Sequence, residues 1–367
     1  MSGSVFGSIF KISTWGESHG RGIGVVIDGC PAGIALDSEY IQRDLDRRRP
    51  GSSKYTTKRS ESDRVEILSG VFEGKTTGTP ISLAIFNEDQ RSKDYSAISN
   101  VFRPGHADFG FESKYGFRDY RGGGRSSARE TAARVAAGAV AKKLLNEIDI
   151  DINAYTLAIN NIKIDEDNFD LDERFNNPLC MPDKEAAERA AKLLDESIAN
   201  LDSVGGVVQC EVKGLKPGIG EPVFDKLDAC LGRAIFSIGA VKGVEFGVGF
   251  GASQMYGSDN NDNFYMDNGQ VKKYTNNSGG VLGGLSDGDK LVFRAAFKPT
   301  PSIAQSQITV NNNGKDIKIA ITGRHDPIVV ARAVVVVEAM TALTLADLVL
   351  MNMSAKIENV KKLYGNV

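Results

Sequence analysis

Residue types that usually build metal sites and disulfides are scarce in this chain of 367 residues. It contains 4 cysteines, none of which form a CxxC pair, and 3 histidines without the spacing of helical or hairpin metal ligands. We therefore expect no metal site, no disulfide scaffold and reduced thiols. The formal net charge of -3 also lacks the basic excess of a general nucleic-acid binder, so we expect no nucleic-acid partner.

Targeting and membrane-spanning signals are also absent from the sequence. Residues 1–20 show no basic start followed by an apolar core, which argues against a signal peptide. The most apolar stretch, Ile328 to Met353, contains Arg332, Glu338 and Asp347, and such charges are costly at the centre of a bilayer. We interpret this stretch as a buried helix and expect a cytoplasmic protein with no membrane partner.

Glycine, in contrast, is abundant. The 40 glycines are scattered, which predicts many tight turns and close backbone approaches, and the 41% hydrophobic and 25% charged content is typical of a globular protein. Strand-like and helical segments mix without regular alternation. This favours an α+β fold, in which helices are layered on antiparallel sheets, over a TIM barrel. No linker divides the chain, so we expect one large domain.

Several helices can be placed from capping and periodicity. A helix is predicted at 37–49 with Asp37 or Ser38 as its N-cap, and another at 128–146 with a capping box of Ser127 and Glu130. The second has small residues on most faces, which predicts close packing on several sides. A further helix at 183–201 carries an apolar stripe, whereas 257–280 is expected to be a polar loop, mobile or ordered by a ligand.

All three histidines lie in loops rich in glycine or proline, each within two residues of a carboxylate. They are His19 in GESHG, His106 in RPGHAD and His325 in GRHDP. This context suits general acid–base chemistry near neutral pH, although a structural histidine stays the alternative for each one taken singly.

Two arginine-rich loops predict anion binding. One spans residues 47–59, and the other, RDYRGGGRSSARE, spans 118–130. In the second, a glycine run is followed by Arg125, Ser126 and Ser127 at the start of a predicted helix, where backbone amides favour an anion. A solvated basic loop is the alternative. A third feature, SGGVLGG at 278–284 with KPTPS at 298–302, indicates only turns. Together these residues indicate an enzyme for an anionic, phosphorylated small molecule.

Six motifs taken in order resemble the chorismate synthase family. They are GESHG at 16–20, DLDRRRPGSSKYTTKR at 44–59, RPGHADF at 103–109, YRGGGRSSARET at 120–131, KPTPS at 298–302 and GRHDP at 323–327. The resemblance runs from near the first residue to about residue 350. It implies a catalytic domain at 1–353, a C-terminal tail at 354–367, and a β-α-β sandwich whose inner helices are flanked by antiparallel sheets.

The resemblance also implies a reaction. The family converts 5-enolpyruvylshikimate 3-phosphate to chorismate and phosphate by an anti-1,4-elimination, the last step of the shikimate pathway, which leads to the aromatic amino acids. This carbon–oxygen lyase chemistry requires reduced FMN without net redox change. The flavin can lend an electron as phosphate leaves and recover it as the C6 hydrogen departs, while the protein supplies positioning and electrostatics.

Site residues follow by match to the family motifs. His19 would lie near the departing phosphate, His106 would keep the flavin in its proper protonation state, and Asp326 would help remove the C6 proton. Substrate would be gripped by Arg48, Lys54 and Arg324. The positions that match flavin contacts are Arg125, Ser126, Ser127, Gly239, Ala240, Gly283, Lys298, Pro299, Thr300, Pro301, Ser302 and again Arg324.

The sequence departs from the family pattern at three flavin-contact segments: Gly239 replaces a frequent Asn, Pro301 a frequent Ser, and Ser278 a frequent Ala. A side-chain contact at 239 would be lost. Family members are homotetramers, and some reduce their own flavin with NADPH. Because no Rossmann motif is present, we expect a separate NADPH-dependent flavin reductase as partner. The alternatives are another flavin-dependent enzyme acting on a phosphorylated acid and, less consistent with the charge, an RNA-binding protein.

Overall fold

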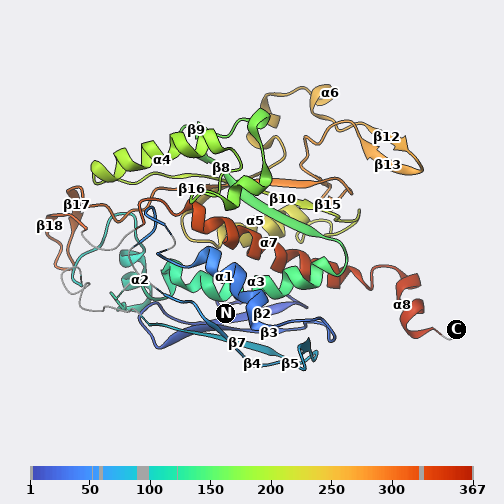
Figure 1. The fold of residues 1–367 in the computed structure, drawn as a ribbon, viewed down its shortest axis with the longest axis horizontal. Coiled ribbons are helices and arrows are strands. Elements are labelled where there is room, and N and C mark those ends of the chain that lie inside the picture. Colours follow the sequence, from blue (N-terminus) through green and yellow to red (C-terminus); the bar gives the residue numbers. More distant parts are fainter. Residues whose placement is uncertain are drawn as a thin grey trace.

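The computed structural model describes residues 3–51, 53–57, 61–88, 99–121, 123–321 and 326–365. Two five-stranded antiparallel sheets enclose a layer of helices (Figure 1). The first sheet has the order β1 (Val5–Phe6), β2 (Lys11–Gly16), β3 (Gly22–Asp28), β7 (Ile81–Phe86) and β4 (Val65–Ser69). The second has the order β11 (Val241–Phe246), β16 (Leu291–Phe297), β10 (Gly206–Lys213), β8 (Asp151–Ile159) and β9 (Ile162–Lys163). The predicted α+β sandwich is therefore confirmed.

The layer between the sheets is built mainly from α1 (Ser38–Arg48), α3 (Thr131–Asn146), α5 (Leu227–Phe236) and α7 (Val330–Asn352). Helix α3 packs on α7 so closely that a Cβ added to Gly138 would lie 2.4 Å from Ala339 Cβ. The small residues of α3 permit this approach and are buried almost throughout. Close packing of this helix on several sides is thus confirmed.

Helix α7 is long and apolar enough to cross a membrane, but 83% of its most apolar window is buried inside the fold. Its neighbours are α1, α3 and α5 together with strands β8 and β10. It is therefore the core helix expected from residues 328–353. Its Glu338 is buried among charged partners, and its Asp347 accepts hydrogen bonds from the backbone N–H groups of residues 8–10.

The start of the helix predicted at 128–146 differs from expectation. Residues 128–130 form a 3-10 turn, and the α-helix begins at Thr131. The Ser127 hydroxyl accepts from the Arg129 N–H at 3.3 Å, whereas the Glu130 side chain pairs with Arg134. The predicted capping box is therefore wrong, because the i,i+4 ion pair takes the carboxylate that would have returned to Ser127.

Two further expectations need correction. The apolar stripe predicted at 183–201 is only partly buried: in α4 (Lys184–Ala199), Ala190 and Leu194 are buried, whereas Ile198 is 40% exposed. Residues 257–280 contain the short helix α6 (Gly257–Asn260) and a hairpin of β12 (Phe264–Asp267) and β13 (Gln270–Lys273). The buried Lys273 orders this segment through ion pairs with Asp262 and Asp287.

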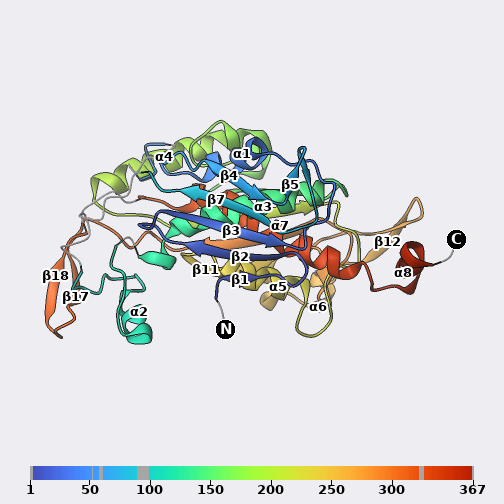
Figure 2. The same ribbon diagram turned by 90° about the horizontal axis from the view of Figure 1, so that it is seen from below.

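The remaining elements lie around the sandwich. At one end, α2 (Asp108–Tyr115) and the hairpin of β17 (Gln307–Val310) and β18 (Asp316–Ile319) project together (Figures 1 and 2). At the other end are the β12–β13 hairpin and α8 (Ile357–Tyr364), none of whose residues is buried. Short hairpins join β5 (Val71–Phe72) to β6 (Lys75–Thr76) and β14 (Val281–Leu282) to β15 (Leu285–Ser286).

Candidate active site

Four of the loops singled out in the sequence meet beside the helical layer. A Cβ on Gly124 would lie 3.9 Å from Glu17 Cδ, and one on Gly123 would lie 3.9 Å from Arg103 Nη2. A Cβ on Gly105 would lie 2.6 Å from Pro301 Cβ. The histidine loop 16–20, the glycine loop 121–127, the histidine loop 103–108 and the loop 298–302 are therefore contiguous.

His106 is held by hydrogen bonds at both ring nitrogens. Its Nδ1 lies 2.9 Å from the Pro104 carbonyl, and its Nε2 lies 3.0 Å from Ser302 Oγ. Because a carbonyl only accepts, Nδ1 carries the proton, and Nε2 of the neutral ring accepts from the Ser302 hydroxyl. Burial and then the charge of Arg103 lower the pKa of His106 to about 4. The ring is therefore neutral at pH 7.

The carboxylate expected to tune His106 has a different primary partner. Asp108 accepts from the backbone N–H and from Nε and Nη2 of Arg103, and it pairs with Arg118 at 3.3 Å. Burial alone would raise the pKa of Asp108, but the hydrogen bonds and charge of Arg103 lower it. Asp108 therefore affects the pKa of His106 through its charge, and the Arg103–Asp108 pair holds the loop that carries the ring.

His19 lies in the half-buried loop between β2 and β3. Arg121 is the main cause of the lowered pKa of Asp119, and the charge of His19 adds to this effect, so His19 lies close to Asp119. Asn87 fixes the loop, since its Nδ2 donates to the carbonyls of Glu17 and Gly20. The Asn87 Oδ1 accepts from Arg129 Nε at 2.8 Å, which ties the His19 loop to a second cluster.

That second cluster, which we call the guanidinium cluster, consists of Arg48, Arg129 and Asp63. Both arginines hydrogen-bond to the Asp63 carboxylate, and all three side chains are almost completely buried. Burial lowers the pKa of Arg48 to about 10 against the pull of Asp63. Among the described residues, Arg48 Nε has no hydrogen-bond partner, and Arg129 Nη2 has none within hydrogen-bond distance but forms an ion pair with the buried Glu61 at 3.7 Å. One buried donor, Arg48 Nε, is thus available to an anion.

Asp326 is joined to the guanidinium cluster through Arg332. The Asp326 carboxylate accepts from the Thr57 N–H and from Arg332 Nη1, each at 2.7 Å. Arg332 Nε in turn donates to the Arg48 carbonyl at 2.9 Å. The structure therefore brings Asp326 and Arg48 together. Arg324, His325 and Gly122 lie outside the described residues.

Lys54 is placed differently from Arg48. Its ammonium is 63% exposed, pairs with Asp195 of α4 at 2.9 Å and lies 4.8 Å from the centre of the Tyr55 ring. In this structure it is engaged at the surface with α4. Its expected contact with substrate stays a prediction.

The side chains of the predicted anion loop bond within the protein. Arg125 donates to the Gly16 carbonyl at 2.9 Å and to Thr14 Oγ1 at 2.7 Å. Ser126 Oγ donates to the Gly123 carbonyl at 2.7 Å, and Ser127 holds the 3-10 turn. These bonds shape the loop around β2, and ligand contact by the three residues stays a prediction.

The loop 298–302 links His106 to the segment containing Gly239 and Ala240. Lys298 Nζ donates to the Gly105 carbonyl at 2.7 Å, and its backbone N–H donates to the carbonyl of Ala240, which has a φ of +72°. Thr300 Oγ1 is buried without a partner among the described residues. Pro299 packs near Gly205, where an added Cβ would lie 3.2 Å from the proline Cδ. Gly283, with a φ of +63°, turns the β14–β15 hairpin.

Sequence reasoning did not select Asp63, Asn87, Arg103 or Arg332 as site residues. Asp63, Asn87 and Arg332 contact residues far away in sequence, so spacing does not reveal them. Arg103 pairs with Asp108 five residues further on and lies in an already selected motif. Arg129 could have been found, because it follows Ser127 in an already selected motif. Among the residues that the structure describes, no group of three or more His, Cys, Asp or Glu side chains is arranged to hold a metal ion.

A cluster of buried guanidinium groups beside a carboxylate and two histidine loops is typical of an enzyme that acts on an anionic small molecule. Comparison with known proteins agrees with this class. A sequence model described as chorismate synthase matches residues 10–350. The chain belongs to the chorismate synthase family.

Relatives support this assignment over almost the whole chain. The chain is 63% identical over 99% of its length to a chorismate synthase of Lachnospira eligens, covering 100% of that protein. It is 62% identical to one of Lachnoclostridium phytofermentans, with 99% and 100% of the two chains covered. A crystal structure of chorismate synthase superimposes with a TM-score of 0.77 at 32% identity, covering 97% of this chain and 96% of the other.

Proposed function

We propose that this chain converts 5-enolpyruvylshikimate 3-phosphate to chorismate and phosphate by anti-1,4-elimination, with reduced FMN and no net redox change. The observation that carries the proposal is the guanidinium cluster and its link through Arg332 to Asp326. The substrate bears a phosphate and carboxylates, which arginine binds through charge-assisted hydrogen bonds. Arg48 Nε, which has no partner among the described residues, supplies a donor for such a group.

The residues present fit a flavin mononucleotide. Thr300 offers a buried hydroxyl without a partner, Lys298 a cation, and Ser126 and Ser127 lie at the helical turn where backbone amides favour a phosphate. The group would be held by Arg125 to Ser127, Gly239, Ala240, Gly283, Lys298 to Ser302, and Arg324. When bound, reduced FMN supplies an electron transiently and accepts it back, which eases loss of the allylic phosphate.

The side chains of this protein would bind the substrate and move protons. Arg48, Lys54 and Arg324 would bind the substrate, and His19 would lie beside the phosphate as it departs. Asp326 would receive the C6 proton, because its two oxygens each keep a lone pair beyond the bonds from Thr57 and Arg332. His106, neutral and held by Ser302, would exchange a proton at Nε2.

The surrounding biology follows from the same assignment. We propose a homotetramer in the cytoplasm that catalyses the final step toward chorismate, the precursor of the aromatic amino acids. We also propose that NADPH acts only indirectly, through a separate flavin reductase, because no dinucleotide-binding fingerprint is present in the sequence.

An anaerobic assay tests the reaction. The protein is mixed with chemically reduced FMN and 5-enolpyruvylshikimate 3-phosphate, and chorismate and phosphate are followed together. Equal formation of both, with the flavin still reduced and no turnover with oxidised FMN, is expected. Stoichiometric consumption of reductant would instead indicate a different flavin enzyme. Turnover with NADPH and oxidised FMN but no added reductase would contradict the proposed need for a reductase.

A further inference from the structure

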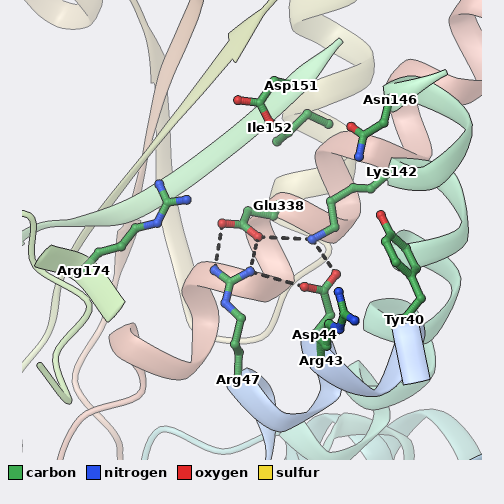
Figure 3. Close-up of a pocket in the computed structure, with 10 residues that line it drawn as sticks. All are labelled: Tyr40, Arg43, Asp44, Arg47, Lys142, Asn146, Asp151, Ile152, Arg174 and Glu338. Atoms are coloured by element: carbon green, nitrogen blue, oxygen red, sulfur yellow. Dashed lines mark hydrogen bonds and ion pairs between the residues drawn. The ribbon is translucent and has the colours of Figure 1, made fainter. Parts of the chain in front are cut away.

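A polar cavity of about 210 Å³ lies on the side of the helical layer, between α1, α3, α7 and the start of β8 (Figure 3). It shares no lining residue with the candidate active site. Four of its lining side chains are cationic and three are carboxylates: Arg43, Arg47, Lys142 and Arg174, with Asp44, Asp151 and Glu338. The cavity is therefore a separate charged site with one cation in excess.

Two of the carboxylates are already neutralised by their neighbours. Glu338 accepts both terminal nitrogens of Arg47, at 2.6 and 2.9 Å, and Asp44 pairs with Lys142 and with Arg47 (Figure 3). Burial alone would raise the pKa of Glu338, but Arg47 and Lys142 lower it to about 2. The α1–α3–α7 ion network is thus balanced without Arg174.

Arg174 is the buried cation whose charge this network does not need for its balance. It lies in the 3-10 turn Leu171–Phe175, is only 7% exposed, and stacks 4.5 Å from the centre of the Phe175 ring. Its Nη2 donates to Asn153 Oδ1 at 2.6 Å, but Nε and Nη1 have no partner among the described residues. Figure 3 shows its guanidinium group reaching toward the space between Asp151 and Glu338. A buried cation with two unmet donors requires an acceptor, since leaving such donors unpaired is costly.

We propose that this cavity is a binding site for a compact oxyanion such as inorganic phosphate, held by Arg174 inside and by Arg43 at the mouth. Arg43 is exposed and lies one turn before Arg47 on α1, so it can approach a ligand without leaving an ion pair of the network. At about 30 Å³ per water molecule, the cavity holds a four-oxygen anion with a few waters. Arg47 and Arg48 are consecutive in α1, so the two anion sites lie on adjacent faces of the same helix turn.

Calorimetric titration of the full-length protein with inorganic phosphate, at constant ionic strength set with chloride, tests the site. We expect Arg174→Gln to weaken binding at this site at least about tenfold and Arg43→Gln to weaken it a few-fold, because each removes charge-assisted hydrogen bonds. Arg189→Gln, which removes an equal charge from the exposed face of α4, is the matched control and should leave binding unchanged. Arg48→Gln, by contrast, should reduce only phosphate binding in the active site, which separates the two sites.

Crystals soaked in tungstate, a tetrahedral oxyanion with strong anomalous scattering, locate the ligand directly. A peak within hydrogen-bond distance of Arg174 would establish the site. Phosphate binding that Arg174→Gln and Arg43→Gln leave intact would overturn the proposal. So would a soaked crystal in which the cavity holds only water or a carboxylate from a second copy of the chain. Because none of these readouts uses turnover, they are independent of the proposed reaction.

Discussion

At the scale of single residues, the site combines one neutral histidine with several buried charges. His106 is held neutral because burial and Arg103 disfavour its proton, and Ser302 donates to the nitrogen that would otherwise receive it. Asp63, by contrast, stays charged because two guanidinium groups surround it. Both effects depend on contacts between distant loops, so substitution of one partner alters the charge state of the other.

The lowered pKa of His106 predicts a pH-dependent stability. Below its ordinary pKa of about 6.5 the unfolded chain binds a proton that the folded site excludes, so folding stability falls as pH drops from about 6.5 to about 4. His106→Asn should remove this part of the slope, measured as the difference between variant and parent in urea unfolding. With only 3 histidines in the chain, ring resonances in NMR titrate separately, and an ordinary midpoint for His106 would refute the neutral ring.

Asp63→Asn tests the guanidinium cluster. The substitution leaves Arg48 and Arg129 buried without their shared counter-ion, and removing one partner of a buried pair costs about 3–5 kcal/mol. The free energy of unfolding in urea measures this loss. Asp46→Asn is the control, because Asp46 and Arg49 form an exposed pair worth about 0–1 kcal/mol. An equal loss of unfolding free energy for the two substitutions would show that Asp63 does not stabilise the cluster.

At the scale of elements, the sequence predicted what local patterns encode. Asp37 does cap α1, with its carboxylate 2.7 Å from the Tyr40 N–H, and the small residues of α3 do permit close packing. The capping box failed because of a second local pattern: Arg134, four residues after Glu130, pairs with the carboxylate that the box needs. Candidate histidines and arginines were recognisable by motif. Asp63 and Arg332 were not, because their links to Arg129 and to the Arg48 carbonyl join residues far apart in sequence.

Gly138→Ala tests the contact between α3 and α7. The new Cβ would lie 2.4 Å from Ala339 Cβ, so the helices must separate, and overpacking of this kind costs about 1–3 kcal/mol. Gly232→Ala in α5 is a matched control, because its added Cβ meets nothing within 4 Å, and it should stabilise by about 0.5–1 kcal/mol. Thermal unfolding of both variants gives the comparison. A stabilising Gly138→Ala would mean that the helix contact is looser than the structure shows.

At the scale of the whole molecule, the arrangement of strands could not be predicted. The order β1-β2-β3-β7-β4 skips the short β5–β6 hairpin, and β10 lies between β8 and β16, which come from distant parts of the chain. Strand periodicity predicts which face of a strand is buried but not which strand pairs with it, since register depends on neighbours across the sheet. The layered architecture was expected from the resemblance, and it is this layering that places the loops of both sheets beside one site.

Removal of residues 354–367 tests the predicted boundary between catalytic domain and tail. No residue of α8 is buried, so the truncated chain should keep its melting temperature within about 2 °C, its turnover and the same oligomeric mass as the full chain in light scattering. Truncation after Met340 is the contrasting variant: it deletes the second half of the buried helix α7 and should prevent folding. Loss of the tetramer with retained monomer stability would instead assign the exposed apolar side chains Ile357, Leu363 and Tyr364 to an interface between copies. The tail would then form part of the interface between copies, and the boundary at residue 353 would be wrong.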